Sequence, residues 1–256
     1  MVALVMMLLF WWGVQVLLDL PPYLLPDPWT VFGVLLERWQ DIGKATMLTG
    51  AASLGGLALS LFVGCLAGLT FARFQWLEKG LFPYAVFFQT VPVVAVAPLV
   101  ILWVGHGFLG VITVAFIISI FPIVSGATLG LTRIPHQQIE LFRLYGASRV
   151  QTLLKLQIPN AMEQVLAGAR VSSGLCVIGA IVGEFSAGFG TGNHGLGYLI
   201  LFSSGQLKTP LLLASILAST FLGFLLFSLV HHVGGWWLKS LRYVQGEEIP
   251  TQRSSQ

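Results

Sequence analysis

Charged residues are scarce in this chain, and their scarcity excludes most classes of soluble protein. Asp, Glu, Lys and Arg make up 9% of the 256 residues, 56% are hydrophobic and the mean hydropathy is +0.86. Soluble domains carry about 25% charged residues, so lipid is the expected solvent for most of this chain. The net charge of +3 lies mainly in loops and forms no broad basic patch, which excludes nucleic-acid binding.

Sequence motifs for covalent chemistry are also missing. The two cysteines, Cys65 and Cys176, lie in apolar runs without a nearby Cys or His partner, so neither a disulfide nor a metal site is expected. The chain contains no G-x-x-x-x-G-K-[ST], so it has no P-loop for ATP, and no H-E-x-x-H. Residues 190–195 match G-x-G-x-x-G but follow no strand, which predicts a flexible turn. We therefore expect neither an enzyme nor a cofactor in this chain.

Long apolar runs are what the sequence contains instead. We expect six transmembrane helices, at residues 2–20, 47–72, 82–104, 108–131, 161–185 and 210–233. Each approaches or exceeds the ~20 residues that cross a bilayer. The first run lacks preceding basic residues and a small-x-small cleavage site, so it is read as a retained span. The prediction is an all-α polytopic membrane protein.

Three regions follow from these spans. They are a first span with an outward interfacial segment (1–45), a transmembrane domain (46–238) and a tail (239–256). The segment 21–45 holds several charges and is expected to face water. Within it, residues 30–40 behind Pro28 are expected to form a short interfacial helix.

Loop charges orient the predicted bundle. On one side lie nine basic residues: Arg73, Lys79, Arg133, Arg143, Arg149, Lys155, Lys239, Arg242 and Arg253. On the other side lie only three: Arg38, Lys44 and Lys208. Lys and Arg accumulate on the cytoplasmic side of membrane proteins. Both termini and residues 133–160 are therefore expected in the cytoplasm, and the loops 21–45 and 186–209 outside.

Small and polar residues interrupt several spans. The pairs Gly64–Gly68, Gly126–Gly130 and Gly179–Gly183 each form a GxxxG, which favours close helix contacts within one chain or between two copies. The third span holds Gln89, Thr90, Pro92 and Pro98. Its two prolines predict a kink or break near mid-membrane, where freed carbonyls face protein or a water-filled path. These four residues are candidates for lining a pathway, and a packing kink is the alternative.

Two ionisable residues lie in the fifth span. Arg170 and Glu184 are about 21 Å apart along one helix, so they cannot pair with each other. Ionisable groups inside a membrane are functional candidates by default. For Arg170 we favour snorkelling of the side chain to the cytoplasmic surface. Glu184 is expected to be solvated near the outer interface or to anchor the loop 186–197.

The segment Glu140–Pro159, ELFRLYGASRVQTLLKLQIP, is a polar island between two spans. A first helix is predicted over residues 136–145, with Ile139, Phe142 and Tyr145 on one face. Gly146 permits a sharp turn, and Ser148 with Gln151 forms a capping-box pattern that starts a second helix, expected to end at Pro159. The island suits docking of a partner, or an interfacial amphipathic helix without one.

The island resembles the cytoplasmic signature of ABC importer permease subunits, E-A-A-x3-G-x9-I-x-L-P. Glu140, Gly146 and Pro159 fall at matching positions, while Leu141 and Phe142 replace the two alanines. Residues 25–28, 91–105 and 195–200 are similar to the subfamily that imports nitrate, sulfonates, taurine, bicarbonate, thiamine-type pyrimidine precursors or riboflavin. The resemblance covers roughly residues 24–238.

The resemblance implies a type I ABC importer permease fold in a bacterial inner membrane. Two copies of the chain, a homodimer, would form the translocation path in the lipid bilayer. Each would present its 136–157 segment to a separate dimer of ATPase subunits, which bind ATP and Mg²⁺, and an extracytoplasmic binding protein would deliver the solute. The implied coupling residues are Glu140, Leu141, Phe142, Gly146, Ala147, Ser148 and Pro159.

Two other classes of protein are weighed against this hypothesis. An ion-coupled secondary transporter predicts ionisable residues near the midplane and often an inverted repeat. An intramembrane enzyme or a non-catalytic membrane scaffold is the other class. Capture of a P-loop ATPase by the chain separates all three.

Overall fold

The computed structural model describes residues 2–19, 21–74, 76–77, 80, 87, 90–187 and 194–244. Within them every regular element is a helix. In chain order these are α1 (Val2–Leu17), α2 (Pro28–Glu37), α3 (Trp39–Arg73), α5 (Val93–Val104), α6 (Phe108–Thr132), α7 (His136–Leu144), α8 (Arg149–Thr152), the π-helix η1 (Leu153–Gln157), α9 (Ile158–Ala187), α10 (Leu196–Gly205) and α11 (Thr209–Val244).

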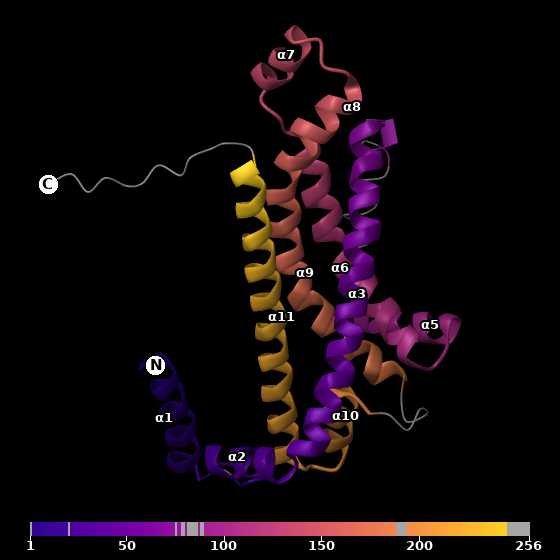
Figure 1. Ribbon diagram of the computed structural model, residues 1–256. Coiled ribbons are helices and arrows are strands. Elements are labelled where there is room, and N and C mark those ends of the chain that lie inside the picture. Colours follow the sequence, from indigo (N-terminus) through magenta and orange to yellow (C-terminus); the bar gives the residue numbers. More distant parts are fainter. Residues whose placement is uncertain are drawn as a thin grey trace, which may run out of the picture.

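Four long helices stand side by side as a bundle, with α7 and α8 beyond one end and α2 and α10 at the other (Figure 1). The helix α9 contacts α6, α3 and α11 and is the centre of the bundle. Among the described residues, four helices are long and apolar enough to cross a membrane: Trp39–Arg73, Phe108–Thr132, Arg149–Ala187 and Thr209–Leu238. Shorter apolar helices cover Val5–Leu17, Val93–Val104 and Leu196–Gly205. The chain is a multi-pass helical membrane protein.

The second and sixth predicted spans extend well past their predicted bounds in the structure. The helix α3 begins at Trp39, eight residues before the predicted start at 47, and so includes Asp41 and Lys44. The helix α11 continues to Val244, past the predicted end at 233. Hydropathy finds only the part of a helix that lipid surrounds, whereas the backbone hydrogen bonds continue through charged turns that lie in water.

The short helix predicted over residues 30–40 is confirmed as α2, which begins at Pro28 and ends at Glu37; its position at the membrane interface stays a prediction. The Asp27 carboxylate caps it by accepting hydrogen bonds from the Thr30 backbone N–H and hydroxyl, at 3.0 and 2.7 Å. These bonds stabilise the charged form and lower the pKa of the Asp27 carboxyl.

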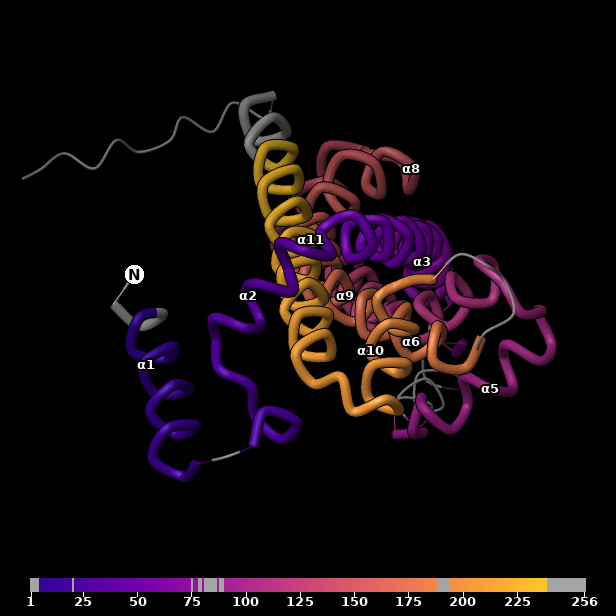
Figure 2. Tube along the Cα trace, turned by 90° about the horizontal axis from the view of Figure 1, so that it is seen from below, coloured from indigo at the N-terminus to yellow at the C-terminus, as the bar shows by residue number. Residues whose placement is uncertain are grey.

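The helix α1 lies beside α2 and stands apart from the bundle (Figure 2). The indole N–H of Trp11 on α1 donates to the carbonyl of Pro26 at 3.1 Å.

The predicted first span contains α1, of 16 residues, and the described part of the predicted third span contains α5, of 12 residues. Residues 82–86 and 88 of the third span lie outside the described residues. The predicted break at Pro92 is confirmed, because α5 begins directly after it. Pro98 lies inside α5 and does not end it. Gln89 lies outside the described residues.

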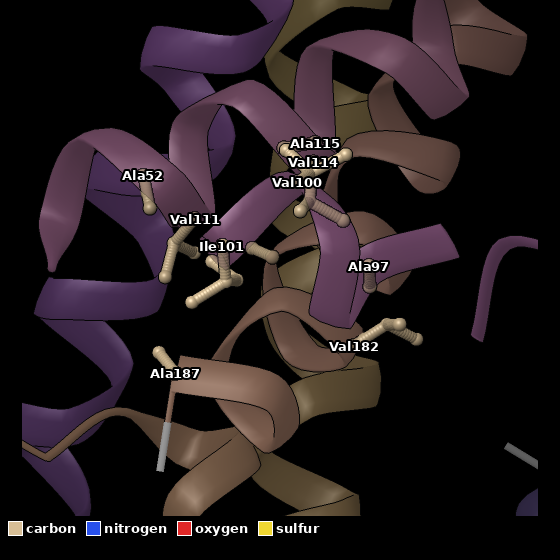
Figure 3. Packing of buried hydrophobic residues seen from close by; sticks show 10 residues of the cluster. Ala52, Ala97, Val100, Ile101, Val111, Val114, Ala115, Val182 and Ala187 are labelled. Carbon is tan, nitrogen blue, oxygen red and sulfur yellow. The ribbon is translucent and has the colours of Figure 1, made fainter. Parts of the chain in front are cut away.

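Small aliphatic side chains fill the junction of α3, α5, α6 and α9 (Figure 3). Ala52, Ala97, Ile101, Ala115 and Ala180 are all buried there. Nearby, hydroxyls join the helices: the Ser60 and Ser119 hydroxyls are 2.7 Å apart, and the Ser172 hydroxyl donates to the Ser119 carbonyl at 2.6 Å. Without a hydrophobic drive between helices in lipid, such close packing and hydrogen bonding holds them together.

Glycines set the distance between the bundle helices. A Cβ at Gly179 of α9 would lie 2.7 Å from the Cα of Ala115, and one at Gly168 would overlap the carbonyl of Pro122, both on α6. Gly64 and Gly68 meet α6 in the same way from α3. All three predicted GxxxG pairs therefore pack against a neighbouring helix of the same chain.

These contacts also fix the register of α6 and α9, which run in opposite directions. Along α9, Ala161, Gly168, Ser172, Gly179 and Gly183 meet α6 at Gly130, Pro122, Ser119, Ala115 and Val111 in turn. The distance of each α6 residue from the two ends of that helix follows from its place among the 25 residues. The register therefore gives the position of each α9 residue along the length of α6.

The glycine contact predicts opposite effects for two substitutions on α9. In Gly168→Ala the added Cβ meets the Pro122 carbonyl, so α6 and α9 must separate, with a loss of about 1–3 kcal/mol of stability. Gly174→Ala is the matched control: its Cβ meets nothing within 4 Å, and the better helix propensity of alanine leaves stability unchanged or slightly raised. Thermal unfolding in detergent measures both, and equal melting temperatures would contradict the contact.

Candidate functional site

The polar segment after residue 135 forms the helix–turn–helix that the sequence predicts. After α7 the backbone turns at Gly146, whose φ of +68° is left-handed. The N–H of Ala147 donates to the Phe142 carbonyl at 2.9 Å and that of Gly146 to the Arg143 carbonyl at 3.0 Å. This pair of bonds is a Schellman motif, which ends the helix.

The second helix of the segment starts at a complete capping box. The Ser148 hydroxyl accepts from the Gln151 N–H at 3.2 Å, and the Ser148 N–H donates to the Gln151 side-chain oxygen at 2.8 Å. Both ends of the turn are therefore fixed by local hydrogen bonds. The shape of the predicted helix–turn–helix is confirmed, and its role stays a prediction.

The predicted end of this second helix at Pro159 is wrong. The helical backbone continues from α8 through the π-helix η1 into α9, and Pro159 is the second residue of α9. Proline has no N–H and its ring clashes with the carbonyl four residues earlier. The wider turn of η1, in which the Ile158 N–H donates to the Leu153 carbonyl, lies directly before the proline and makes room for it.

Large apolar side chains project from this segment into the surroundings. Leu144 is 84% exposed and Tyr145 83%, and no residue of α7 is buried. We call the five exposed side chains the apolar end patch: Leu141, Leu144, Tyr145, Val150 and Leu154. An apolar group of this kind indicates an interaction site.

The face of the patch differs from the predicted one. Of the predicted row, Tyr145 is exposed, while Ile139 and Phe142 are half-buried. The sequence analysis did not identify Leu144, because this residue is not one of those spaced three apart on the predicted face. Glu140 is exposed on the same helix.

Glu184 is the best-defined polar site near the opposite end of the bundle. Its side chain is only 8% exposed, and its two carboxylate oxygens accept from the Thr49 hydroxyl at 2.8 Å and the Gly197 N–H at 2.6 Å. The Thr49 oxygen in turn accepts from the Leu196 N–H at 2.8 Å. Residues from α3 and α9 thus bind the first two N–H groups of α10.

This network caps α10 with side chains from outside the helix. The first N–H groups of a helix have no partner within it, and a carboxylate there is favoured by the helix dipole. The expectation that Glu184 is solvated is wrong, because α10 covers it. The alternative, that it anchors the following loop, is confirmed at Gly197. Residues 188–193 lie outside the described residues.

The short helix α10 is the element that the sequence did not reveal. The apolar run Leu196–Phe202 is a signal for a helix, but 10 residues are too short to cross a membrane, so the sequence pattern predicts a loop there.

A cavity of about 110 Å³ lies beside Glu184 and is partly lined by His194 and Tyr198, whose rings stack with centroids 3.7 Å apart. The described residues hold no group of three His, Cys, Asp or Glu placed to bind a metal ion.

Arg170 is half-buried and lies about midway along the length of the bundle. Two residues before it, Gly168 meets Pro122, which lies about 21 Å from the Phe108 end of α6 and about 15 Å from the Thr132 end. The Arg170 Nε is buried and has no hydrogen-bond partner. The prediction that the Arg170 side chain snorkels to the cytoplasmic surface stays a prediction, because it depends on where the membrane surface lies along α6.

The other described residues of the predicted pathway lie in and before α5, a helix that contacts α9. Thr90, Pro92 and Pro98 are exposed in and before α5, which packs into the bundle through Ala97 and Ile101. Their role in lining a pathway stays a prediction.

Comparison with known proteins finds transport proteins of the membrane. The model of a family described as "Binding-protein-dependent transport system inner membrane component" matches residues 56–238. The chain is 35% identical over 220 residues to the riboflavin transport system permease protein RibX of Chloroflexus aurantiacus, covering 84% of this chain and 80% of that protein. It is 32% identical over 230 residues to the formylaminopyrimidine transport permease protein ThiX of Halalkalibacterium halodurans, with 88% and 89% covered. It is 29% identical over 231 residues to the taurine transport system permease protein TauC of Escherichia coli, with 88% and 82% covered.

The Glu184 network predicts different effects for two threonines one turn apart on α3. Thr49→Val removes the hydroxyl that serves both Glu184 and Leu196, which leaves buried polar groups unpaired and lowers stability by about 1–3 kcal/mol. Thr46→Val is the control, because the Thr46 hydroxyl donates to the Ile42 carbonyl of its own helix. Thermal unfolding in detergent measures stability, and hydrogen exchange at the Leu196 and Gly197 amides is expected to accelerate only in Thr49→Val. Equal exchange in both variants would exclude the cap.

Proposed function

The chain belongs to the family of binding-protein-dependent transport system inner membrane components. We propose that it works as the permease subunit of an ABC importer. It forms part of the path along which a small solute crosses the membrane. The movement is driven by ATP hydrolysis in a separate subunit, since the sequence has no P-loop. The relatives transport riboflavin, formylaminopyrimidine and taurine, and we propose a solute of this range, which includes nitrate, sulfonates and bicarbonate.

The apolar end patch is the observation that carries this proposal. Leu141, Leu144 and Tyr145 are exposed in and directly after α7, which lies beyond one end of the bundle (Figure 1). We assign this end to the cytoplasm because it carries the basic loops. A group of large apolar side chains at a water-facing end is covered by a protein partner or by the membrane surface. The cytoplasmic ATPase that an importer needs is the partner whose position fits.

Coupling in this proposal runs through the turn between α7 and α8. Leu141, Phe142 and Leu144 enter an apolar groove of the ATPase, and Glu140 lies at the rim of the contact. Gly146, Ala147 and Ser148 keep α7 at a fixed angle to α8 through the Schellman motif and the capping box. The continuous helix α8–η1–α9, which passes through Pro159, carries a displacement of the turn into the centre of the bundle.

The assembly that we propose contains two copies of this chain, two ATPase subunits that bind ATP and Mg²⁺, and an extracytoplasmic binding protein. The binding protein delivers the solute to the end that carries α2 and α10. Counting α1 and α5 with the four long helices gives six spans, with both termini in the cytoplasm. The binding protein selects the solute before it reaches the permease.

Rigidity of the turn is tested at Gly146. In Gly146→Val a β-branched residue must adopt a φ of +68°, which costs of order 1–3 kcal/mol. We expect capture of the ATPase subunit and ATP-driven uptake to fall about tenfold, since each 1.4 kcal/mol changes an equilibrium tenfold. Gly235→Val is the control, because a Cβ at Gly235 meets nothing within 4 Å. Unchanged capture and uptake in Gly146→Val would refute the coupling role.

The apolar nature of the contact is tested at Leu144. Because this side chain is 84% exposed, Leu144→Asp leaves the melting temperature of the isolated permease unchanged. Burial of a leucine stabilises a contact by roughly 1.5–3 kcal/mol, so we expect capture of the ATPase to fall at least tenfold. Gln138→Asp introduces the same charge on an exposed site of α7 and is expected to retain capture. Equal capture by both variants would place the contact elsewhere.

A further inference from the structure

One face of α9 differs from the exposed faces of the other long helices. We call it the α9 stripe: Glu163, Ala167, Arg170, Val171, Gly174 and Ile178, all exposed or half-exposed. These positions recur every three to four residues, so they share one side of the helix. By contrast, α3 exposes Phe62 and Leu66, and α11 exposes Phe221 and Phe224.

Large apolar side chains suit contact with lipid tails, whereas small residues and charges do not. Charged side chains within a membrane face the bundle interior or a water-filled cavity. Small residues are enriched where helices or other protein surfaces approach closely. The α9 stripe contains small residues and charged residues, and α9 is the central helix of the bundle. We therefore expect the stripe to face a space lined by protein and not lipid.

Arg170 lies at the middle of this stripe. The register of α9 on α6 places it about 15 Å or more from either end of α6, and its Nε is buried without a partner. Among the described helices around it, α5, α6 and α10 carry no acidic residue, and neither does α3 between Lys44 and Arg73. On α9 itself, Glu184 is about 21 Å away and accepts from Thr49 and Gly197. Glu163 is two turns away, about 10 Å along the axis.

We propose that the α9 stripe lines the translocation path and that the Arg170 guanidinium binds an anionic group of the solute halfway across the membrane. The group is a carboxylate, a sulfonate or a phosphate, because these match the planar set of donors on a guanidinium. The inference rests on the proposed role as a permease and adds a chemical class of substrate and a residue that recognises it.

Thiol labelling tests the proposal without knowledge of the solute. In a chain with Cys65 and Cys176 replaced by alanine, Ala167→Cys and Gly174→Cys each place a thiol on the stripe beside Arg170. A Cβ at Gly174 meets nothing within 4 Å. The intact importer in membrane vesicles is treated with a sulfonate-bearing or a trimethylammonium-bearing methanethiosulfonate. Phe224→Cys, on an exposed apolar face of α11, is the lipid-facing control.

We expect both stripe thiols to react and Phe224→Cys to stay unmodified. The ratio of the anionic to the cationic reaction rate should fall roughly tenfold when Arg170→Gln is added, because a unit charge one helical turn away attracts one reagent and repels the other. Arg170→Lys, which retains the charge, should keep the ratio. No labelling at either stripe position would overturn the path, and an unchanged ratio in Arg170→Gln would overturn the anion site. The ratio would also stay unchanged if an acidic side chain of a second copy neutralised Arg170, and this result would equally overturn the anion site.

Capture of the ATPase in the same preparation separates this inference from the proposed function. Arg170→Gln lies away from the apolar end patch and is expected to capture the ATPase as the parent chain does. Failure of the parent chain to capture an ATPase would count against the proposed function, while the labelling ratio would still decide the role of Arg170.

Discussion

The close approach of α6 to α9, which glycines permit, is the contact on which the rest of the structure depends. Gly168 and Gly179 on α9 bring its backbone against Pro122 and Ala115. In lipid, where apolar side chains gain nothing by leaving their surroundings, dispersion contacts at this distance and hydrogen bonds between helices supply the packing energy. A side chain at these positions would separate the two helices and remove the central contact of the bundle.

The position of α9 links regions that are far apart in space. Its helical backbone begins with α8 beside the apolar end patch, passes Arg170 at the middle of the bundle and ends near Glu184. The π-helix η1 keeps this rod continuous through Pro159. One continuous helical backbone therefore connects the apolar end patch, Arg170 and the cap of α10. A permease that couples events on its two sides requires a connection of this kind.

Local patterns in the sequence were sufficient for most of the secondary structure. Apolar runs located the four long helices, Pro92 located the start of α5, and Gly146 with Ser148 and Gln151 gave the helix–turn–helix in detail. These features succeed because they act within a few residues of the chain. The same reasoning gave wrong boundaries at Trp39 and Pro159, where a helix crosses charged or proline-containing turns. It also missed α10, whose first N–H groups are bound by residues that are distant in sequence.

The sequence by itself determined that this is a multi-pass helical membrane protein with a polar, well-capped segment between two spans, because composition and local turn chemistry are properties of the chain alone. Only the tertiary structure decided the environments of the two ionisable residues in α9. Glu184 is covered and bound through contacts with Thr49 and Gly197, and the depth of Arg170 follows from the register of α9 on α6. Hydropathy counts residues along one helix, whereas burial and depth depend on which helix lies beside it.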